Sequence, residues 1–244
     1  MMKKLFILTF LFIASYQIFA QINFFTVEKP SIELRTDVDF PIKKDLKFEN
    51  IGISNSVTAK MNELYTNLGV RISKSTFDLV TEAVYAPTFF NIVNIGAGFT
   101  YHFYNYFNTS YENDILAGVY FSWHKGPIFR FDGRVCYFAK IATILDNSYS
   151  FIKKNETLKN TSVVINLHFL WQIASWINVY FNFESSNYYD YVLFGTPFFT
   201  TGFQINAINN LSFGSDIKIK MVDMFTVPPS ISELKINTFV KVRI

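Results

Sequence analysis

The sequence predicts an all-β protein, an antiparallel up-and-down transmembrane β-barrel that follows an N-terminal signal peptide. Half of the 244 residues are apolar and 19% are aromatic, yet only 17% are charged, below the roughly 25% of a soluble domain. Apolar and polar residues alternate with a period of two along most of the chain, as in strands with two unlike faces. Only the extreme N-terminus approaches the about 20 apolar residues of a membrane-crossing helix.

The first element is a targeting segment. Lys3 and Lys4 form a basic start, Leu5–Phe19 is almost uninterruptedly apolar, and Ala20 is a small residue at a plausible cleavage point. This pattern predicts a signal peptide over residues 1–20 and a barrel domain over residues 21–244, with an uncleaved anchor helix as the alternative. Without the two lysines, 20 basic residues face 19 acidic ones, so we expect no nucleic-acid partner.

The N-terminal half contains amphipathic strands in series. In Ile32–Phe40 the even positions are apolar or Thr, whereas the odd positions are ionic. Leu46–Asn55 is a weaker second strand, because Ser54–Asn62 alternates poorly. The clear alternation returns in Leu64–Ser73, Phe77–Tyr85 and Ile92–Tyr104.

The C-terminal half continues the pattern to the last residue. Ile115–Trp123 and Phe129–Ile141 flank a turn at His124–Pro127, where Gly and Pro favour chain reversal. Cys136 lies in an apolar stretch and is expected to be a buried small hydrophobe. The remaining strands are Val163–Ile173 with Ile177–Phe183, Phe199–Ala207 with Leu211–Met221, and Leu234–Ile244.

Strand length and loop length favour a membrane barrel over a soluble sandwich. The segments match the about 9–11 residues that a tilted strand needs to cross a bilayer. Tight links at Ala174–Ser175 and Asn209–Asn210 alternate with longer ones, the pattern of short periplasmic turns and long external loops. The expected long links are Asn105–Asn113, Leu145–Asn160, Ser186–Thr196 and Val222–Glu233.

Aromatic residues gather at the expected strand ends. Trp123, Trp171 and Trp176 stand beside the tight turns. Such positions suggest aromatic girdles at the two membrane interfaces. The corresponding tyrosines near the long loops are Tyr101, Tyr104, Tyr106, Tyr188, Tyr189 and Tyr191.

An even strand number places both termini on the periplasmic side, so we predict twelve strands. Ten is the alternative if residues 21–60 form a plug or a periplasmic segment. The expected strands start near residues 31, 46, 63, 76, 91, 113, 128, 161, 176, 197, 211 and 234.

The polar faces would line the lumen. If the first and last strands pair, the acidic row Glu33, Asp37 and Asp39 faces a basic row on the last strand. These ions either pair and fill the lumen or form a conduit that selects small solutes by charge. The predicted pore-lining residues are Glu33, Arg35, Asp37, Asp39, Arg71, Asp78, Glu82, His102, Arg130, Asp132, Arg134, Lys140, His168, Glu184, Asp216, Lys218, Lys220, Lys235, Lys241 and Arg243.

Catalytic motifs are not found in the sequence. Lipid-acting barrel enzymes carry a His-x-Ser pair, but His102, His124 and His168 are not followed by that serine. There is no Gly-rich phosphate loop, no paired Cys or His metal spacing and no GxSxG motif. We therefore expect no enzyme activity, catalytic residue, metal or cofactor.

The leader, the alternating strands and the amphipathic last strand together resemble bacterial outer-membrane β-barrel proteins of the porin-like kind, over residues 31–244. Ile244 departs from the terminal Phe that is usual in this class. The resemblance implies residence in outer-membrane lipid, periplasmic chaperones and the outer-membrane assembly machinery; it does not imply an oligomeric state.

The expected function is porin-like passive passage of small polar solutes. The alternatives are a closed structural or adhesive surface barrel that binds ligands through its external loops and, less strongly supported, a lipid-modifying barrel enzyme. A secreted soluble sandwich is a third possibility for the fold.

Gel mobility separates barrel from sandwich. An intact membrane barrel in detergent should migrate differently before and after boiling, because it resists SDS until it is heated. The measurement is electrophoresis of the detergent-extracted protein with and without boiling. Identical migration, together with recovery in the aqueous phase without detergent, would contradict the barrel.

Overall fold

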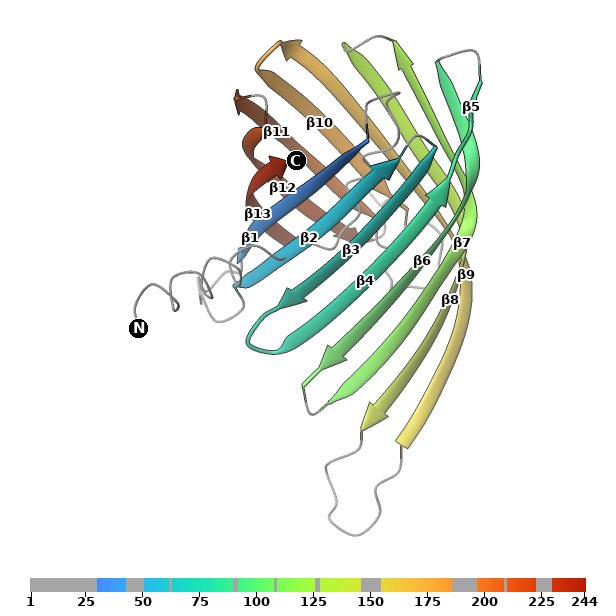
Figure 1. The fold of residues 1–244 in the computed structure, drawn as a ribbon. Helices are drawn as coiled ribbons and strands as arrows, with labels where there is room; N and C mark the ends of the chain where they lie inside the picture. Colours follow the sequence, from blue (N-terminus) through green and yellow to red (C-terminus); the bar gives the residue numbers. More distant parts are fainter. Residues whose placement is uncertain are drawn as a thin grey trace, which may run out of the picture.

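The computed structural model contains one antiparallel β-sheet closed on itself (Figure 1). The residues described are 30–42, 51–61, 63–89, 92–107, 109–125, 128–145, 155–185, 197–208, 210–222 and 230–244. The predicted signal peptide, residues 1–20, lies outside them. Among the described residues, no helix is long and apolar enough to cross a membrane.

Twelve long strands and one two-residue strand make up the sheet. Their bounds are β1 Ser31–Ile42, β2 Gly52–Met61, β3 Leu64–Ile72, β4 Thr76–Tyr85, β5 Thr88–Phe89, β6 Val93–Tyr106, β7 Ser110–Lys125, β8 Phe129–Leu145, β9 Asn155–Ala174, β10 Ile177–Glu184, β11 Phe198–Ile208, β12 Leu211–Val222 and β13 Ser230–Arg243.

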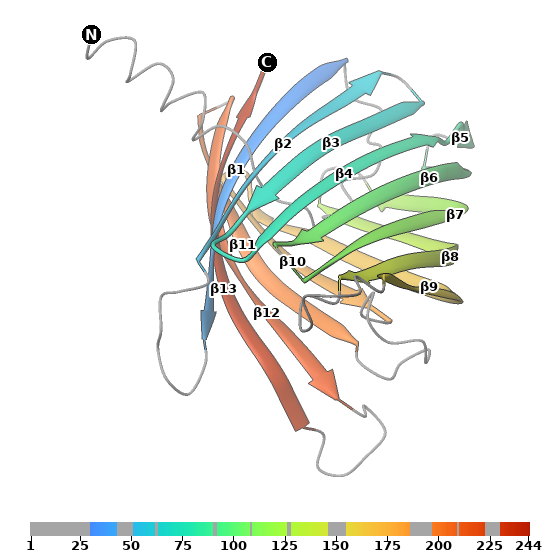
Figure 2. The same cartoon turned by 90° about the horizontal axis from the view of Figure 1, so that it is seen from below.

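The barrel closes between the first and the last strand. Residues Glu33 to Ile42 of β1 pair with Arg243 to Leu234 of β13, and Ile32 and Ile244 exchange two backbone hydrogen bonds of 3.1 and 2.8 Å. Figure 2 shows β1 between β13 and β2. The short β5 pairs only with β6, and β4 pairs with β6 directly. The prediction of a twelve-strand antiparallel barrel is therefore confirmed.

The two ends of the barrel differ. Both termini of the strand series and the tight links after β2, β7, β9 and β11 lie at one end, which we call the turn end. The links after β1, β8, β10 and β12 lie at the other, the loop end. The predicted link Asn105–Asn113 is wrong as a long loop, because Tyr106 pairs with Ser110 and Thr109 closes a turn on Tyr106 with a 2.9 Å bond.

The second strand was predicted too early. β2 starts at Gly52 instead of near residue 46, and it runs through the stretch that alternates poorly. Its inward side carries the small polar residues Ser54, Ser56 and Thr58, all buried. Its outward Asn55 is also buried and accepts a 3.3 Å hydrogen bond from Thr36 on β1. Since β1 and β2 both belong to the sheet, the ten-strand alternative is wrong.

Three other strands extend beyond their predicted starts. β7 starts at Ser110 rather than near residue 113, β9 at Asn155 rather than near residue 161, and β13 at Ser230 rather than near residue 234. In each case the strand is lengthened at the loop end, where polar residues continue the ladder. A polar residue in a ladder keeps its backbone pairing but loses the apolar signal that marks a strand in the sequence.

The outer surface is rich in exposed aromatic and aliphatic side chains. Trp123, Trp171 and Trp176 are 39%, 57% and 55% exposed near the turn end. A ladder of packed rings crosses β7 to β11, including Phe131 and Phe169 with centroids 4.6 Å apart. Such a surface suits the hydrocarbon of a bilayer.

Not every predicted girdle tyrosine faces outward. Tyr104 is buried inside the barrel, and its ring stacks on that of Tyr106 at 6.3 Å. Both are even-numbered on β6, the face that also carries His102. Tyr188, Tyr189 and Tyr191 lie outside the described residues.

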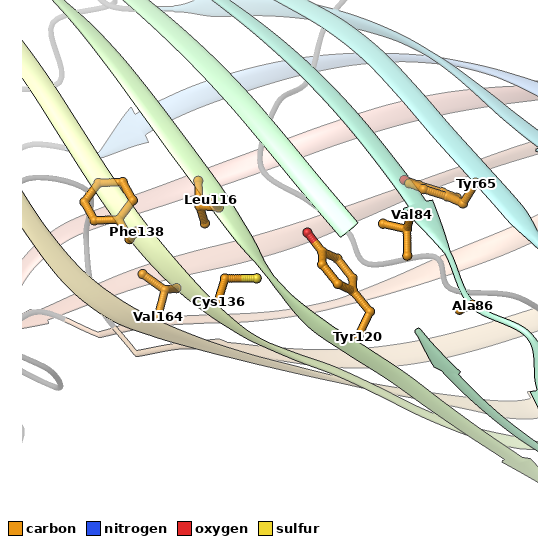
Figure 3. Packing of buried hydrophobic residues seen from close by; sticks show 8 residues of the cluster. All are labelled: Tyr65, Val84, Ala86, Leu116, Tyr120, Cys136, Phe138 and Val164. Carbon is orange, nitrogen blue, oxygen red and sulfur yellow. The ribbon is translucent and has the colours of Figure 1, made fainter. Parts of the chain in front are cut away.

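An apolar cluster also lies inside the barrel. Figure 3 shows Leu116, Phe138 and Val164 on the neighbouring strands β7, β8 and β9. Cys136 belongs to this cluster and is buried, as predicted. The interior wall is therefore partly apolar around β7, β8 and β9, although the rest of it is mainly ionic.

Barrel closure can be tested by a disulfide across β1 and β13. Val38 and Thr238 are register partners, and partner Cα atoms lie about 4.5–5.5 Å apart, within disulfide range. In a Cys136→Ser background, Val38→Cys with Thr238→Cys should oxidise and shift mobility on a non-reducing gel. The control is Val38→Cys with Val240→Cys, a diagonal pair about 7–8 Å apart. Equal cross-linking of both pairs would contradict the register.

Candidate functional site in the barrel lumen

The predicted site residues lie on the inner side of the alternating strands, where their charges are brought together. Fourteen of the twenty are buried. Glu33, Arg71 and Lys218 keep 12–14% side-chain exposure and Lys235 keeps 25%. Arg243 is 45% exposed at the turn end. Twelve strands lie between the about eight that enclose a filled interior and the about sixteen that leave an aqueous channel, so large side chains can meet across this lumen.

A first buried cluster joins β4 to β8. Arg134 Nη1 donates to Glu82 Oε1 at 3.1 Å, and the hydroxyls of Thr100 and Tyr120 donate to the same oxygen at 3.2 and 3.3 Å. Gly98 makes room for this arrangement, because a Cβ there would lie 2.7 Å from the Tyr120 ring. The Glu82 carboxylate of β4 thus accepts hydrogen bonds from side chains on three other strands, β6, β7 and β8.

A second buried cluster joins β1, β10, β12 and β13. Arg35 Nε donates to both Asp37 oxygens at 2.8 and 2.9 Å. Asn237 Nδ2 donates to Asp37 at 3.0 Å and to Asp216 at 3.1 Å, and the Tyr180 hydroxyl donates to Asp216 at 2.7 Å. Together, the Glu82 cluster and this Asp37 cluster are called the lumen belt.

Arg71 on β3 connects two acidic residues from different strands. It lies 2.7 Å from Asp39 of β1 and 3.2 Å from Asp78 of β4. To reach Asp39 it passes over β2 at Gly52, where a Cβ would lie 2.6 Å from the guanidinium. Glycine at this position therefore permits an ion pair that skips a strand.

The other ion pairs lie nearer the two ends or along single strands. At the turn end, Glu33 lies 3.6 Å from Lys241 and 3.9 Å from Arg243. These contacts join the acidic row of β1 to the basic row of β13. The two rows face each other across the β1–β13 seam as predicted, but the other ions have partners elsewhere: Asp37 pairs with Arg35, Asp39 with Arg71, and Lys235 with Glu233. The remaining pairs are Arg130 with Asp132, Lys140 with Glu112, and Lys218 with Glu184. Lys220 is half-buried, with its ammonium 5.9 Å from the centre of the Phe198 ring.

The two inward histidines lie on different strands, each beside a tyrosine ring. His102 on β6 is buried with its ring 3.6 Å from that of Tyr104. His168 on β9 is buried with its ring 5.9 Å from that of Tyr180. Within the described ranges, no three His, Cys, Asp or Glu residues could hold a metal ion together.

Four residues of the lumen were missed from the sequence. Tyr120, Tyr180 and Asn237 complete the belt, and Glu112 partners Lys140. Their positions on the inward period-two face of each strand were the available signal. The prediction weighed charge above hydrogen-bonding capacity and so passed over the three neutral residues, and Glu112 lay in the expected link Asn105–Asn113.

The central side chains of the lumen belt are withdrawn from solvent. Arg134, Tyr120 and Asp37 are each at most 1% exposed.

Comparison with solved structures places the barrel in a known architecture. The KdgM porin in complex with disordered oligogalacturonate has a TM-score of 0.54 at 8% identity, covering 87% of this chain and 98% of that one. The NanC porin has a TM-score of 0.54 at 11% identity, covering 86% and 98%. The translocator domain of autotransporter NalP from Neisseria meningitidis has 0.51 at 13%, covering 91% and 90%.

These likenesses are likenesses of fold. The chain has the porin-like fold of an outer-membrane β-barrel, as the resemblance implied. No protein-family model matches the sequence, and no curated protein matches it significantly.

Removal of Glu82 tests the energetic role of the lumen belt. In Glu82→Ala the buried Arg134 loses the carboxylate that lies 3.1 Å away, and breaking a buried pair on one side costs about 3–5 kcal/mol. The double variant Glu82→Leu with Arg134→Met should recover most of the loss, because no charge remains to be compensated. Urea unfolding in lipid vesicles, followed by tryptophan fluorescence, measures both.

Glu233→Ala is the matched control. The carboxylate of Glu233 also forms an ion pair, with Lys235, but its side chain is 34% exposed, and exposed pairs contribute about 0–1 kcal/mol. Equal destabilisation by Glu82→Ala and Glu233→Ala would show that the lumen belt is not a special centre of stability.

Proposed function

We propose that this protein is an outer-membrane barrel through which small polar solutes pass by diffusion, with the lumen belt as its narrowest part. The proposal includes export by residues 1–20, insertion by the assembly machinery with help from periplasmic chaperones, a turn end facing the periplasm, and residence in outer-membrane lipid. The predicted pore-lining residues would form the wall of the passage. Enzyme activity is not part of it.

The observation that carries the proposal is an interior made of matched ions. Buried ion pairs are weak contributors to stability, and well-packed apolar residues of similar volume often stabilise as much or more. A barrel that served only as a scaffold would therefore gain little from a lumen with Arg71, Glu82, Arg134 and Asp216. Paired charges that can exchange partners suit water and polar solutes, which compete for the same hydrogen bonds.

Positive and negative side chains are nearly balanced in the lumen, which indicates weak selectivity between cations and anions. Arg71 is shared by two carboxylates, and Glu33 by Lys241 and Arg243. Neither cation nor anion would meet a wall of one sign. Size, set by the lumen belt, would then decide which solutes pass.

The closed structural or adhesive barrel is the second candidate, favoured by the near-zero exposure of the lumen belt. The external loops that would bind ligands fall largely outside the described residues. The two candidates differ in whether the wild-type protein conducts ions.

Conductance in planar bilayers decides between them. The folded wild-type protein should give small, weakly ion-selective steps. Glu82→Ser with Arg134→Ser should enlarge the steps severalfold, because both long side chains leave the lumen belt together. The control, Lys235→Ser with Glu233→Ser, removes a pair nearer the loop end and should leave the step size almost unchanged.

Two outcomes would overturn the channel. If wild-type protein is silent and the Glu82 and Arg134 double variant conducts, the native barrel is a closed one. If neither conducts, the lumen is no passage and the structural candidate stands.

A further inference from the structure

Four polar residues form a patch on the inner wall between β9 and β10. Asn166 and His168 of β9 are register partners of Glu184 and Asn182 of β10. On the other side, β8 places Arg134 and Asp132 opposite Asn166 and His168. We call these four residues the β9–β10 patch; it adjoins the lumen belt at Arg134.

The patch is buried but its hydrogen bonding is incomplete. Asn166 is 0% exposed, His168 and Glu184 2%, and Asn182 7%. Both amide atoms of Asn166, Nδ1 of His168, Oδ1 of Asn182 and Oε1 of Glu184 have no hydrogen-bond partner among the described residues. Burial of a polar atom without a partner opposes folding, so a concentration of such atoms at one place requires an explanation.

The neighbouring lumen belt shows that the fold can satisfy such groups. Glu82, Asp37 and Asp216 each accept at least two hydrogen bonds at a similar depth. Buried polar atoms without a hydrogen bond occur elsewhere in the lumen, as at both oxygens of Asp114, but in the β9–β10 patch five of them lie on four residues that are paired across two strands. Its free donors and acceptors point inward from two adjacent strands.

We infer that the β9–β10 patch binds a neutral, hydroxyl-rich solute such as a sugar. A hydroxyl group both donates and accepts, which suits two carboxamides, an imidazole nitrogen and a carboxylate oxygen. A few convergent polar groups in an otherwise enclosed space are typical of small-molecule sites. Anions would meet the Glu184 carboxylate, whose other oxygen lies 3.9 Å from the Lys218 ammonium.

The inference deepens the proposed function, because it rests on a lumen that solutes can enter and names the class that is held there. Binding and conduction are nevertheless separate measurements. A sugar can be retained by a barrel that passes no current, and a barrel can pass ions without retaining a sugar.

The test is equilibrium binding of radiolabelled maltose to the folded protein in detergent, with glycine betaine as a probe that lacks hydroxyl groups. Wild-type protein should bind maltose and not betaine. Asn166→Leu with Asn182→Leu should weaken maltose binding at least tenfold and leave the unfolding midpoint unchanged or raised, since two incompletely bonded amides are replaced by apolar groups.

Asn67→Leu is the matched control. Asn67 is an inward amide of β3 whose oxygen accepts a 3.1 Å bond from Thr58. This variant should keep its maltose affinity, and its unfolding midpoint should fall because Thr58 loses its acceptor. If the double leucine variant does not fold, Asn182→Thr tested alone must also weaken binding.

The outcomes separate the two proposals. No maltose binding by a wild-type protein that conducts ions overturns the inference and leaves the channel intact. Maltose binding by a protein that is silent in bilayers overturns the channel and keeps the site. Unchanged affinity in the double leucine and Asn182→Thr variants shows that the sugar is held elsewhere.

Discussion

The backbone ladder between β1 and β13 is the interaction on which the rest of the structure depends. The core of a bilayer offers no water to unpaired amides, so a sheet can cross it only if no edge remains. Ten register pairs from Glu33 to Ile42 and the two bonds between Ile32 and Ile244 remove that edge. Because side chains alternate along a strand, this one register also decides which residues of β1 and β13 face inward.

Once the inside is fixed, the contents of the lumen follow from geometry. A ring of twelve strands brings Glu82 of β4 within 3.1 Å of Arg134 of β8, although 52 residues separate them. Asn237 reaches Asp37 at a separation of 200 residues. The same enclosure removes these groups from water, so each ion depends on the others. The lumen belt is therefore held in place by the closed ladder rather than being the cause of closure.

Strands with strongly contrasting faces could be predicted from the sequence, because a bilayer on one side and a polar lumen on the other impose a period of two. Ile32–Phe40 shows this contrast fully. β2 does not, since its inward face carries Ser54 and Ser56 while its outward Asn55 is satisfied by Thr36. The inward side of each strand could be read locally, but ion partners could not: whether Asp39 meets Arg71 depends on a glycine in the strand between them.

The contrast between the lumen belt and the β9–β10 patch carries the functional argument furthest. Both lie on the inner wall and both are withdrawn from solvent, yet the carboxylates of Glu82, Asp37 and Asp216 each accept at least two hydrogen bonds, whereas five buried polar atoms of the patch have none among the described residues. A buried group without its partner costs about 1–3 kcal/mol, which the long closed ladder can tolerate. The side chains of the lumen belt supply hydrogen bonds to one another, whereas the β9–β10 patch is better explained by a solute that supplies the bonds the protein does not.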